Sequence, residues 1–178
     1  MQPIRKYTIS MLRFAIVLLA RVVGAQSPTP AKSHFREVKV ENKALLEMLK
    51  GEKKFSLSQL RVYNHKGLQV ADFGSGEDDT FPANLARVLQ SPPKENSKTL
   101  ESETKALVEK DGKPLNTLPD ADFTIVEYWA DWCAPCRTQS AQLKKVIASQ
   151  PGLSINVLHV EADPMKLPEL KGKIKKQK

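Results

Sequence analysis

Apolar and polar positions divide the second half of the chain into a strand, a helix and another strand. Residues 123–129 form a short, mostly apolar run with β-branched and aromatic members, which predicts a strand. A stripe at helical spacing that begins at Cys136 and includes Leu143 predicts an amphipathic helix over 134–149. Residues 153–160 predict a strand that is covered on both faces, in which His159 is expected to be a packed residue and not a ligand or catalyst. These three elements make a right-handed βαβ unit with a parallel sheet.

The first half of the chain carries a different pattern. Residues 60–64 and 68–73, joined by a turn at 65–67, predict a β-hairpin. Residues 80–90 predict a helix with a proline in its first turn. Two more helices are expected over 42–50 and 100–110, and polar stretches at 26–32 and 91–97 are expected to be connections.

The two cysteines of the chain, Cys133 and Cys136, stand three positions apart at the start of the predicted long helix. There the sulfur of Cys133 would lie beside unpaired N–H groups, whose partial positive charge favours a thiolate. We expect this sulfur to be reachable from solvent, with Cys136 one turn further in, close enough to attack a disulfide that Cys133 has formed with another molecule. The spacing therefore predicts thiol–disulfide exchange.

The cysteine pair has two other interpretations. A Cys-x-x-Cys motif can be half of a zinc site, but three scattered histidines and the carboxylates offer no matching second pair of ligands. A purely structural disulfide is also possible, although closing so small a loop stabilises a fold little. The redox interpretation is preferred, and we expect neither a metal nor another cofactor.

Residues 123–137 (FTIVEYWADWCAPCR) resemble the strand, active-site turn and helix start of thioredoxin-fold proteins. The resemblance covers the pattern Trp-Ala-x-Trp-Cys-x-Pro-Cys, with alanine in place of the more usual glycine between the cysteines. It implies that Cys133 is the nucleophile, Cys136 the resolving thiol and Glu127 a proton acceptor. Further residues are expected to shape the site and bind substrate: Trp129, Trp132, Ala134 and Pro135.

Glu127 is expected to be buried because of its place in the strand. Alternation puts Glu127 on one face with Ile125 and Trp129, which are both apolar. Burial would raise the pKa of its carboxyl group. The alternative is that Glu127 faces solvent at a sheet edge.

The chain departs from the family pattern after Pro164. A cis-proline loop, a hairpin and a helix normally follow, and residues 165–178 are too few and too polar to form them. The hairpin and helix of residues 55–90 have the same order, so we expect them to dock on the sheet as in a circular permutation. The alternative is a separate N-terminal module. Contact between Val62 or Val70 and strand 123–128 would distinguish the two.

The expected fold class is therefore α/β and thioredoxin-like, with a central mixed sheet of four or five strands and helices on both faces. We expect a signal peptide over 1–25, a linker and helix over 26–54, the docking hairpin and helix over 55–90, a linker over 91–97, the CxxC domain over 98–170 and a basic tail over 171–178. At the permuted equivalent of the cis-proline stand Ser58 and Gln59. This loss motivates a second hypothesis, a thioredoxin-fold binding module without efficient redox turnover.

The N-terminus indicates the compartment. Basic residues precede the apolar run 14–20, and small residues lead up to Ala25, which is typical of a secretory signal. We therefore expect a periplasmic or secreted protein, with membrane association only if the leader is retained. DGKPLNTL, residues 111–118, is similar to the segment ahead of the active-site strand in extracytoplasmic, cytochrome-maturation-type thioredoxins.

The charge of the chain adds little to this picture. The 28 basic residues outnumber the 20 acidic ones, but the excess lies in the leader and in residues 171–178. The basic tail lacks the interleaved aromatic residues of a nucleic-acid surface, so no nucleic-acid partner is expected. The expected partners are protein thiols and disulfides and an unidentified redox partner.

Overall fold

The computed structural model describes residues 32–51, 57–74 and 79–170 of the 178-residue chain. The expected leader and the basic tail lie outside these residues. The elements are β1 (Ser33–Val40), α1 (Asn42–Gly51), β2 (Leu60–Asn64), β3 (Gln69–Phe73), α2 (Phe81–Gln90), α3 (Leu100–Thr104), β4 (Leu107–Glu109), β5 (Phe123–Trp129), α4 (Ala134–Ala148) and β6 (Ile155–Glu161), followed by 3-10 helices Pro164–Lys166 and Pro168–Leu170.

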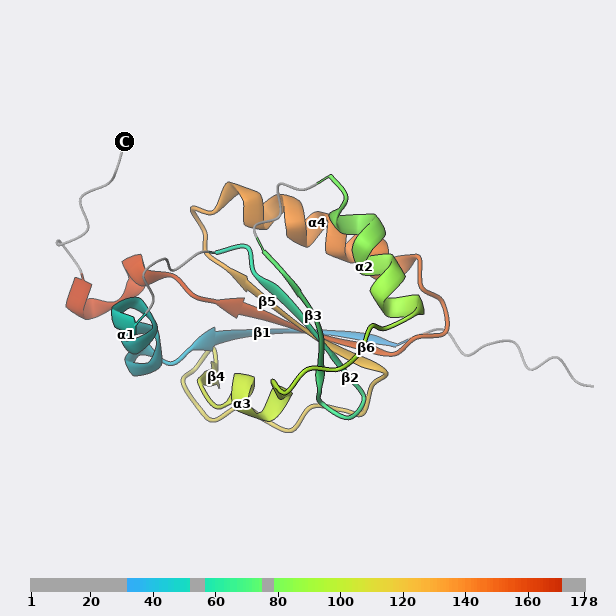
Figure 1. Cartoon of the computed structure of the whole chain (residues 1–178). Helices are drawn as coiled ribbons and strands as arrows, with labels where there is room; N and C mark the ends of the chain where they lie inside the picture. The colour runs from blue at the N-terminus through green and yellow to red at the C-terminus, as the bar shows by residue number, and fades with distance from the viewer. Residues whose placement is uncertain (1–31, 52–56, 75–78, 171–178) are drawn as a thin grey trace, which may run out of the picture.

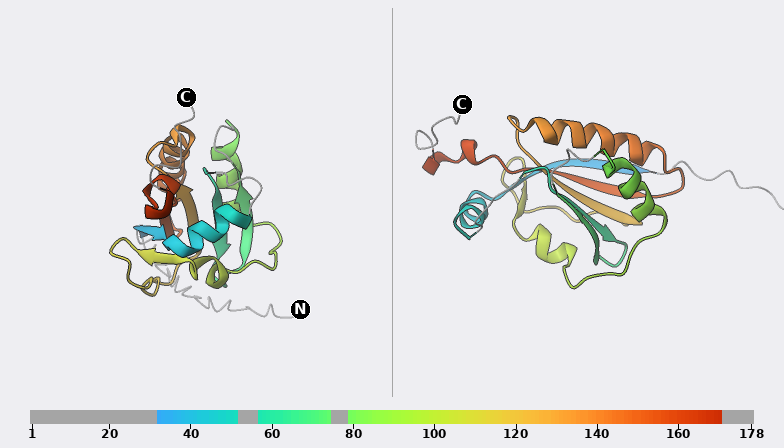
Figure 2. Two further views of the ribbon diagram at one scale, coloured as in Figure 1. Left: turned by 90° about the vertical axis from the view of Figure 1, so that its left-hand side faces the viewer. Right: turned by 45° about the horizontal axis from the view of Figure 1, so that its top comes forward.

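A mixed six-stranded sheet, with strand order β3-β2-β5-β6-β1-β4, forms the centre of the molecule (Figure 1). Helices α2 and α4 cover one face, and α3 lies against the other (Figure 2). Strands β5 and β6 are parallel and lie in the middle, as the βαβ prediction requires. Their side chains point alternately into two apolar clusters, so Ile125 packs under α2 and α4 while Val126 packs on the opposite side.

The hairpin β2–β3 completes the sheet beside β5. Strand β2 pairs antiparallel with β5, and Val62 lies directly opposite Ile125. Helix α2 then packs beside α4 on the same face, with Leu85 fully buried. This is the contact expected of a docked hairpin, and the hairpin forms no module of its own.

Two predictions about the secondary structure are wrong, namely the number of strands in the sheet and the helix over 100–110. The sheet has six strands instead of four or five, because residues 33–40, expected to be part of a linker, form β1 between β6 and β4. The helix expected over 100–110 stops at Thr104, and the chain continues as β4. Leu107 is buried opposite Val40, and the N–H of Glu41 donates to the carbonyl of Ala106 at 2.8 Å. Pairing with β1 therefore overrides the helical tendency of this segment.

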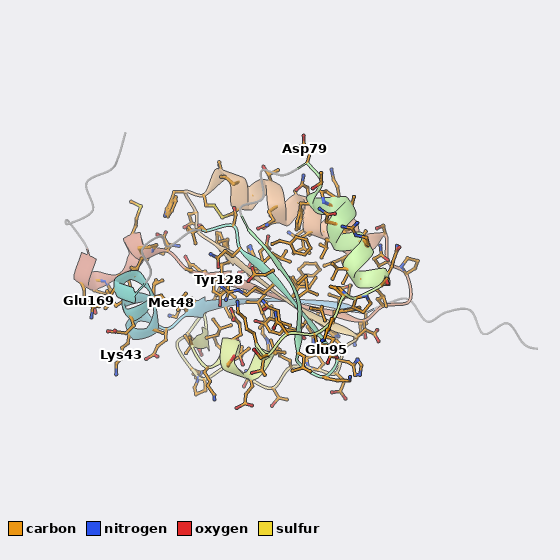
Figure 3. The ribbon with its side chains drawn as sticks, viewed as in Figure 1. Lys43, Met48, Asp79, Glu95, Tyr128 and Glu169 are labelled. Atoms are coloured by element: carbon orange, nitrogen blue, oxygen red, sulfur yellow. A yellow bond between two sulfur atoms is a disulfide. The ribbon has the colours of Figure 1, made fainter. Side chains whose placement is uncertain are left out.

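A cluster of partly buried polar side chains links α3 to the sheet through hydrogen bonds. The carboxylate of Glu103 accepts hydrogen bonds from the guanidinium of Arg61 and from the hydroxyls of Tyr63 and Tyr128. The guanidinium carbon of Arg61 also lies 5.4 Å from the ring centre of Tyr128. Burial raises the pKa of both tyrosines. Tyr128 lies in the interior of the molecule, where this cluster joins β2, β5 and α3 (Figure 3).

Helix α1 lies across the end of the sheet at which β5 and β6 finish (Figure 2). Leu45 of α1, Leu57 and Leu167 share one apolar cluster with both cysteines. That cluster positions the functional site at this end. Within the described part of the chain, no helix has the length and apolar character needed to cross a bilayer.

Candidate functional site

The Cys-x-x-Cys turn connects β5 to α4. Cys133 is the residue that caps the N-terminus of α4, and its sulfur accepts a hydrogen bond from the N–H of Cys136 at 3.2 Å. Pro135 fits the first turn because that turn needs no N–H donor there. The two cysteines are joined by a disulfide, with their Cα atoms 5.3 Å apart. The sulfur of Cys133 therefore lies where helix N–H groups stabilise negative charge.

The disulfide is less accessible than the sequence indicated. Cys133 is 5% exposed and Cys136 1%, whereas we expected a solvent-reachable Cys133. Ser58 lies against both of them, with its hydroxyl 3.8 Å from the sulfur of Cys133 and 3.6 Å from that of Cys136. Ser58, in the segment that leads into β2, therefore accounts for part of the low exposure of the two sulfurs.

Ser58 is a site residue that sequence reasoning missed. It was noted only because no proline stands there, and among the described residues there is no cis peptide bond. Its backbone has a φ of 66°, in the left-handed region that residues other than glycine seldom adopt. Its hydroxyl is buried and faces both sulfurs. No local sequence signal predicts that conformation, which depends on how the hairpin docks.

Glu127 is buried, as its place in β5 predicts, and only 2% of it is exposed. It lies on the α4 face, where the hydroxyl of Ser140 donates to its Oε1 at 2.7 Å. Burial raises the pKa of Glu127 to about 7, against smaller opposing effects of Ser140 and Lys144. Ser140 follows Cys136 by one helical turn, so the carboxyl group faces the stripe of α4 that carries Cys136.

His159 lies next to Glu127 across the parallel pair β5–β6. We expected a packed strand residue there, and its ring does stack on Trp129 with centroids 4.6 Å apart. It also makes polar contacts. Its Nε2 lies 3.4 Å from the hydroxyl of Ser140 and 3.6 Å from Oε2 of Glu127.

The residues expected to bind substrate lie around the disulfide. Trp132 is 53% exposed, and its indole N–H donates to Oδ1 of Asp163 at 2.9 Å. Ala134 is exposed and Pro135 half-buried. Met165, also exposed, follows Asp163 on the next loop. This apolar rim fits the predicted role in contacting a substrate, which stays a prediction.

The comparisons with known proteins agree with this site. Residues 113–175 match the family described as Thioredoxin. This segment belongs to the thioredoxin-like superfamily. A protein named "Putative thioredoxin 2", from Streptomyces coelicolor, is 31% identical to the chain over 48 residues. That match covers 27% of this chain and 36% of the relative. No solved structure matches.

The thioredoxin-like segment contains β5, α4 and β6, together with both cysteines and Glu127. The hairpin and α2 precede it in the chain, although they lie beside it in the sheet. That the hairpin and α2 correspond to the permuted end of a thioredoxin fold stays a prediction, and Ser58 reaches the site from outside the matched segment.

Three carboxylates next to the thioredoxin-like site were considered as metal ligands. Oxygen atoms of Asp131, Glu161 and Asp163 lie within 4.8 Å of one another. The ammonium group of Lys166 already forms ion pairs with two of them, with Asp131 at 2.7 Å and with Glu161. These contacts raise the pKa of Lys166. Asp163 accepts from Trp132. The cluster thus serves to position loops around the disulfide.

Proposed function

We propose that this protein is an extracytoplasmic thiol–disulfide oxidoreductase that exchanges disulfides with protein partners. The observation that carries the proposal is the cysteine pair itself. One sulfur caps a helix and accepts a hydrogen bond from the N–H of the other cysteine, and a buried carboxyl group of raised pKa on β5 accepts a hydrogen bond from Ser140, one helical turn beyond Cys136. The proposed partners are protein thiols and disulfides and a further redox protein that renews the active form.

The reaction begins when the thiolate of Cys133 attacks a sulfur of the partner's disulfide. One Cys133–partner bond forms, and the other partner sulfur leaves as a thiolate that takes a proton from water. Glu127 then accepts the proton of Cys136. The resulting thiolate attacks Cys133, which forms the intramolecular disulfide and releases the second partner sulfur. Two electrons pass to the partner, and the reverse sequence oxidises a partner dithiol.

Cys136→Ser tests the proposal. This variant retains the nucleophile but cannot resolve the mixed disulfide, so covalent complexes with partner proteins should accumulate through Cys133. They should disappear on treatment with a reducing agent. Cys133→Ser is the matched control and should trap far fewer. Absence of complexes from both reducing and oxidising preparations would contradict catalysis.

A binding module without efficient turnover is the second candidate. The small exposure of both sulfurs and the serine in place of the expected proline favour it. The two candidates differ in rate. A catalyst should reduce a disulfide-bonded test protein faster than the same concentration of free dithiol, whereas a binding module should not.

The proposed location depends on residues 1–25. Their basic start, apolar run and small residues before Gln26 support export and cleavage after Ala25. N-terminal sequencing of the protein recovered from outside the cytoplasm should begin at Gln26. Recovery of the full chain in the membrane fraction would instead support a retained anchor.

A further inference from the structure

A row of titratable side chains crosses the sheet at the level of the buried acid. Glu127 of β5 lies opposite His159 of β6, and His159 lies opposite Glu37 of β1. Residues paired in this way point to the same face. The side-chain exposure rises along the row, from 2% at Glu127 to 24% at His159 and 55% at Glu37. The row therefore leads from the core to the solvent.

Ser140 of α4, the helix that covers this face of the sheet, contacts the first two members of the row, Glu127 and His159. Its hydroxyl donates to Glu127 at 2.7 Å and lies 3.4 Å from Nε2 of His159. Stacking on Trp129 holds the imidazole in that orientation. A carboxyl group, a hydroxyl group and a partly exposed imidazole thus follow one another within contact distance.

We propose that Ser140 and His159 form the proton exit of Glu127. This inference rests on the proposed function, because Glu127 gains a proton only when Cys136 is deprotonated. Ser140 and His159 touch no reacting sulfur, so they are positioning and relay residues that act through Glu127. Their role is to carry the proton that Glu127 takes from Cys136 on to solvent during the resolving step, so that Glu127 stays ionised while the second thiolate forms.

The transfer balances without another reactant. The carboxyl proton of Glu127 passes to the oxygen of Ser140 while the hydroxyl proton of Ser140 passes to Nε2 of His159. Glu127 is then a carboxylate again, Ser140 keeps one proton and His159 is an imidazolium. The imidazolium gives a proton to water at its exposed edge. No electron moves in this step.

The charges around the relay suit an acceptor that is neutral at rest. Burial lowers the pKa of His159, Lys144 of α4 and Lys110 lower it further, and Glu37 of β1 raises it. Lys110 pairs with Glu37 and so weakens that opposing effect. The imidazole therefore has a free nitrogen at neutral pH and gives up a received proton readily.

The test follows the resolving step in the full-length protein. Reduced protein mixed with a dithiobis-nitrobenzoate reagent releases one coloured thiolate when Cys133 attacks and a second when Cys136 resolves the mixed disulfide. For His159→Asn we expect the first release to be unchanged. The second should be about tenfold slower at pH 7, below the usual range for acid–base catalysis because water can enter in place of the ring.

Added imidazole should restore much of the lost rate in His159→Asn, and the difference from the unmodified protein should vanish at alkaline pH. The equilibrium reduction potential should not change. Ser140→Ala leaves the 3.6 Å contact between Glu127 and His159, so its second release should slow less than that of His159→Asn. It serves as a second variant if His159→Asn fails to fold. His65→Asn, in the exposed hairpin turn, is the matched control and should behave like the unmodified protein.

Equal second-phase rates for His159→Asn and the unmodified protein at every pH would overturn the relay. A loss that imidazole does not restore and that accompanies a changed potential would also overturn it, because it would mark a structural role. Failure of the unmodified protein to release the second thiolate would instead overturn the proposed function.

Discussion

Replacing Glu127 by glutamine should change how stability depends on pH. The side chain is almost completely buried, and an amide has nearly the same shape as the carboxyl group. The amide oxygen can still accept the hydrogen bond from Ser140. The substitution therefore removes the titration of the group while retaining its principal contact.

The magnitude follows from the raised pKa. Glu127 titrates near 7 in the folded protein, against an ordinary value of 4.5. Between these values the folded state binds more protons than the unfolded state, so the stabilising contribution is fully present below 4.5 and is lost as the pH rises through 7. At about 1.4 kcal/mol per pH unit, the complete loss is about 3.5 kcal/mol. Solvent screening is small at 2% exposure.

Urea unfolding of the oxidised proteins at several values between pH 5 and 8.5 measures this effect. Glu127→Gln should gain about 2.5 kcal/mol relative to the unmodified protein between the two ends of the range, because a small part of the loss already lies below pH 5. His159 acts in the opposite direction, because its lowered pKa makes its contribution present above 6.5 and lost as the pH falls. Its contribution is common to both proteins and largely cancels in the difference.

The control is Glu47→Gln on the exposed side of α1, which should show no such gain. Parallel stability curves for Glu127→Gln and the unmodified protein across the whole range would refute the reasoning. The carboxyl group would then titrate at its ordinary value, and its proposed role as proton acceptor for Cys136 would lose its physical basis.

Three further predictions concern other parts of the molecule. Ser58→Ala removes a hydroxyl group that can donate to a thiolate, so the reduced form should lose about 1.4 kcal/mol and the reduction potential should become about 30 mV more negative, as measured against a glutathione couple. Glu103→Gln leaves the largely buried Arg61 with only the longer ion pair to Asp72, at 3.7 Å, and should lower the free energy of unfolding by about 2 kcal/mol in urea. Gly67→Ala, at a φ of 73° in the hairpin turn, should cost about 1 kcal/mol in the same assay, and an unchanged midpoint would contradict the turn geometry.

The central βαβ unit could be predicted because its signals are local. The strand over 123–129 has the bounds that the apolar run indicates, and α4 ends at Ala148, one residue before the predicted end. Its apolar stripe and the Pro-Gly pair beyond it depend on nearby residues alone. The two cysteines and Glu127 could likewise be found from a short contiguous motif, because one strand and one helix position all of them.

The outer strands could not be predicted for the opposite reason. In β1 only Val38 and Val40 are buried apolar residues at period two, which is too short a run to stand out. Strand β4 has three residues and is formed by pairing with β1, from which it is separated by about 70 positions of sequence. Such pairing depends on the folded sheet, so the helical tendency of residues 100–110 was the stronger local signal and proved misleading.

Ser58 belongs to a loop backbone that differs from the one expected of the family, so it is not a simple replacement for proline. Proline fixes φ near −65°, whereas Ser58 has a φ of 66°. A proline at this position would require the segment before β2 to be rebuilt. In exchange, the left-handed turn directs a hydroxyl group toward both sulfurs, where a proline ring offers no hydrogen-bond donor. The site therefore combines a motif from one contiguous segment with a hydroxyl group that only the docked hairpin can deliver, from a residue 75 positions before Cys133 in the chain.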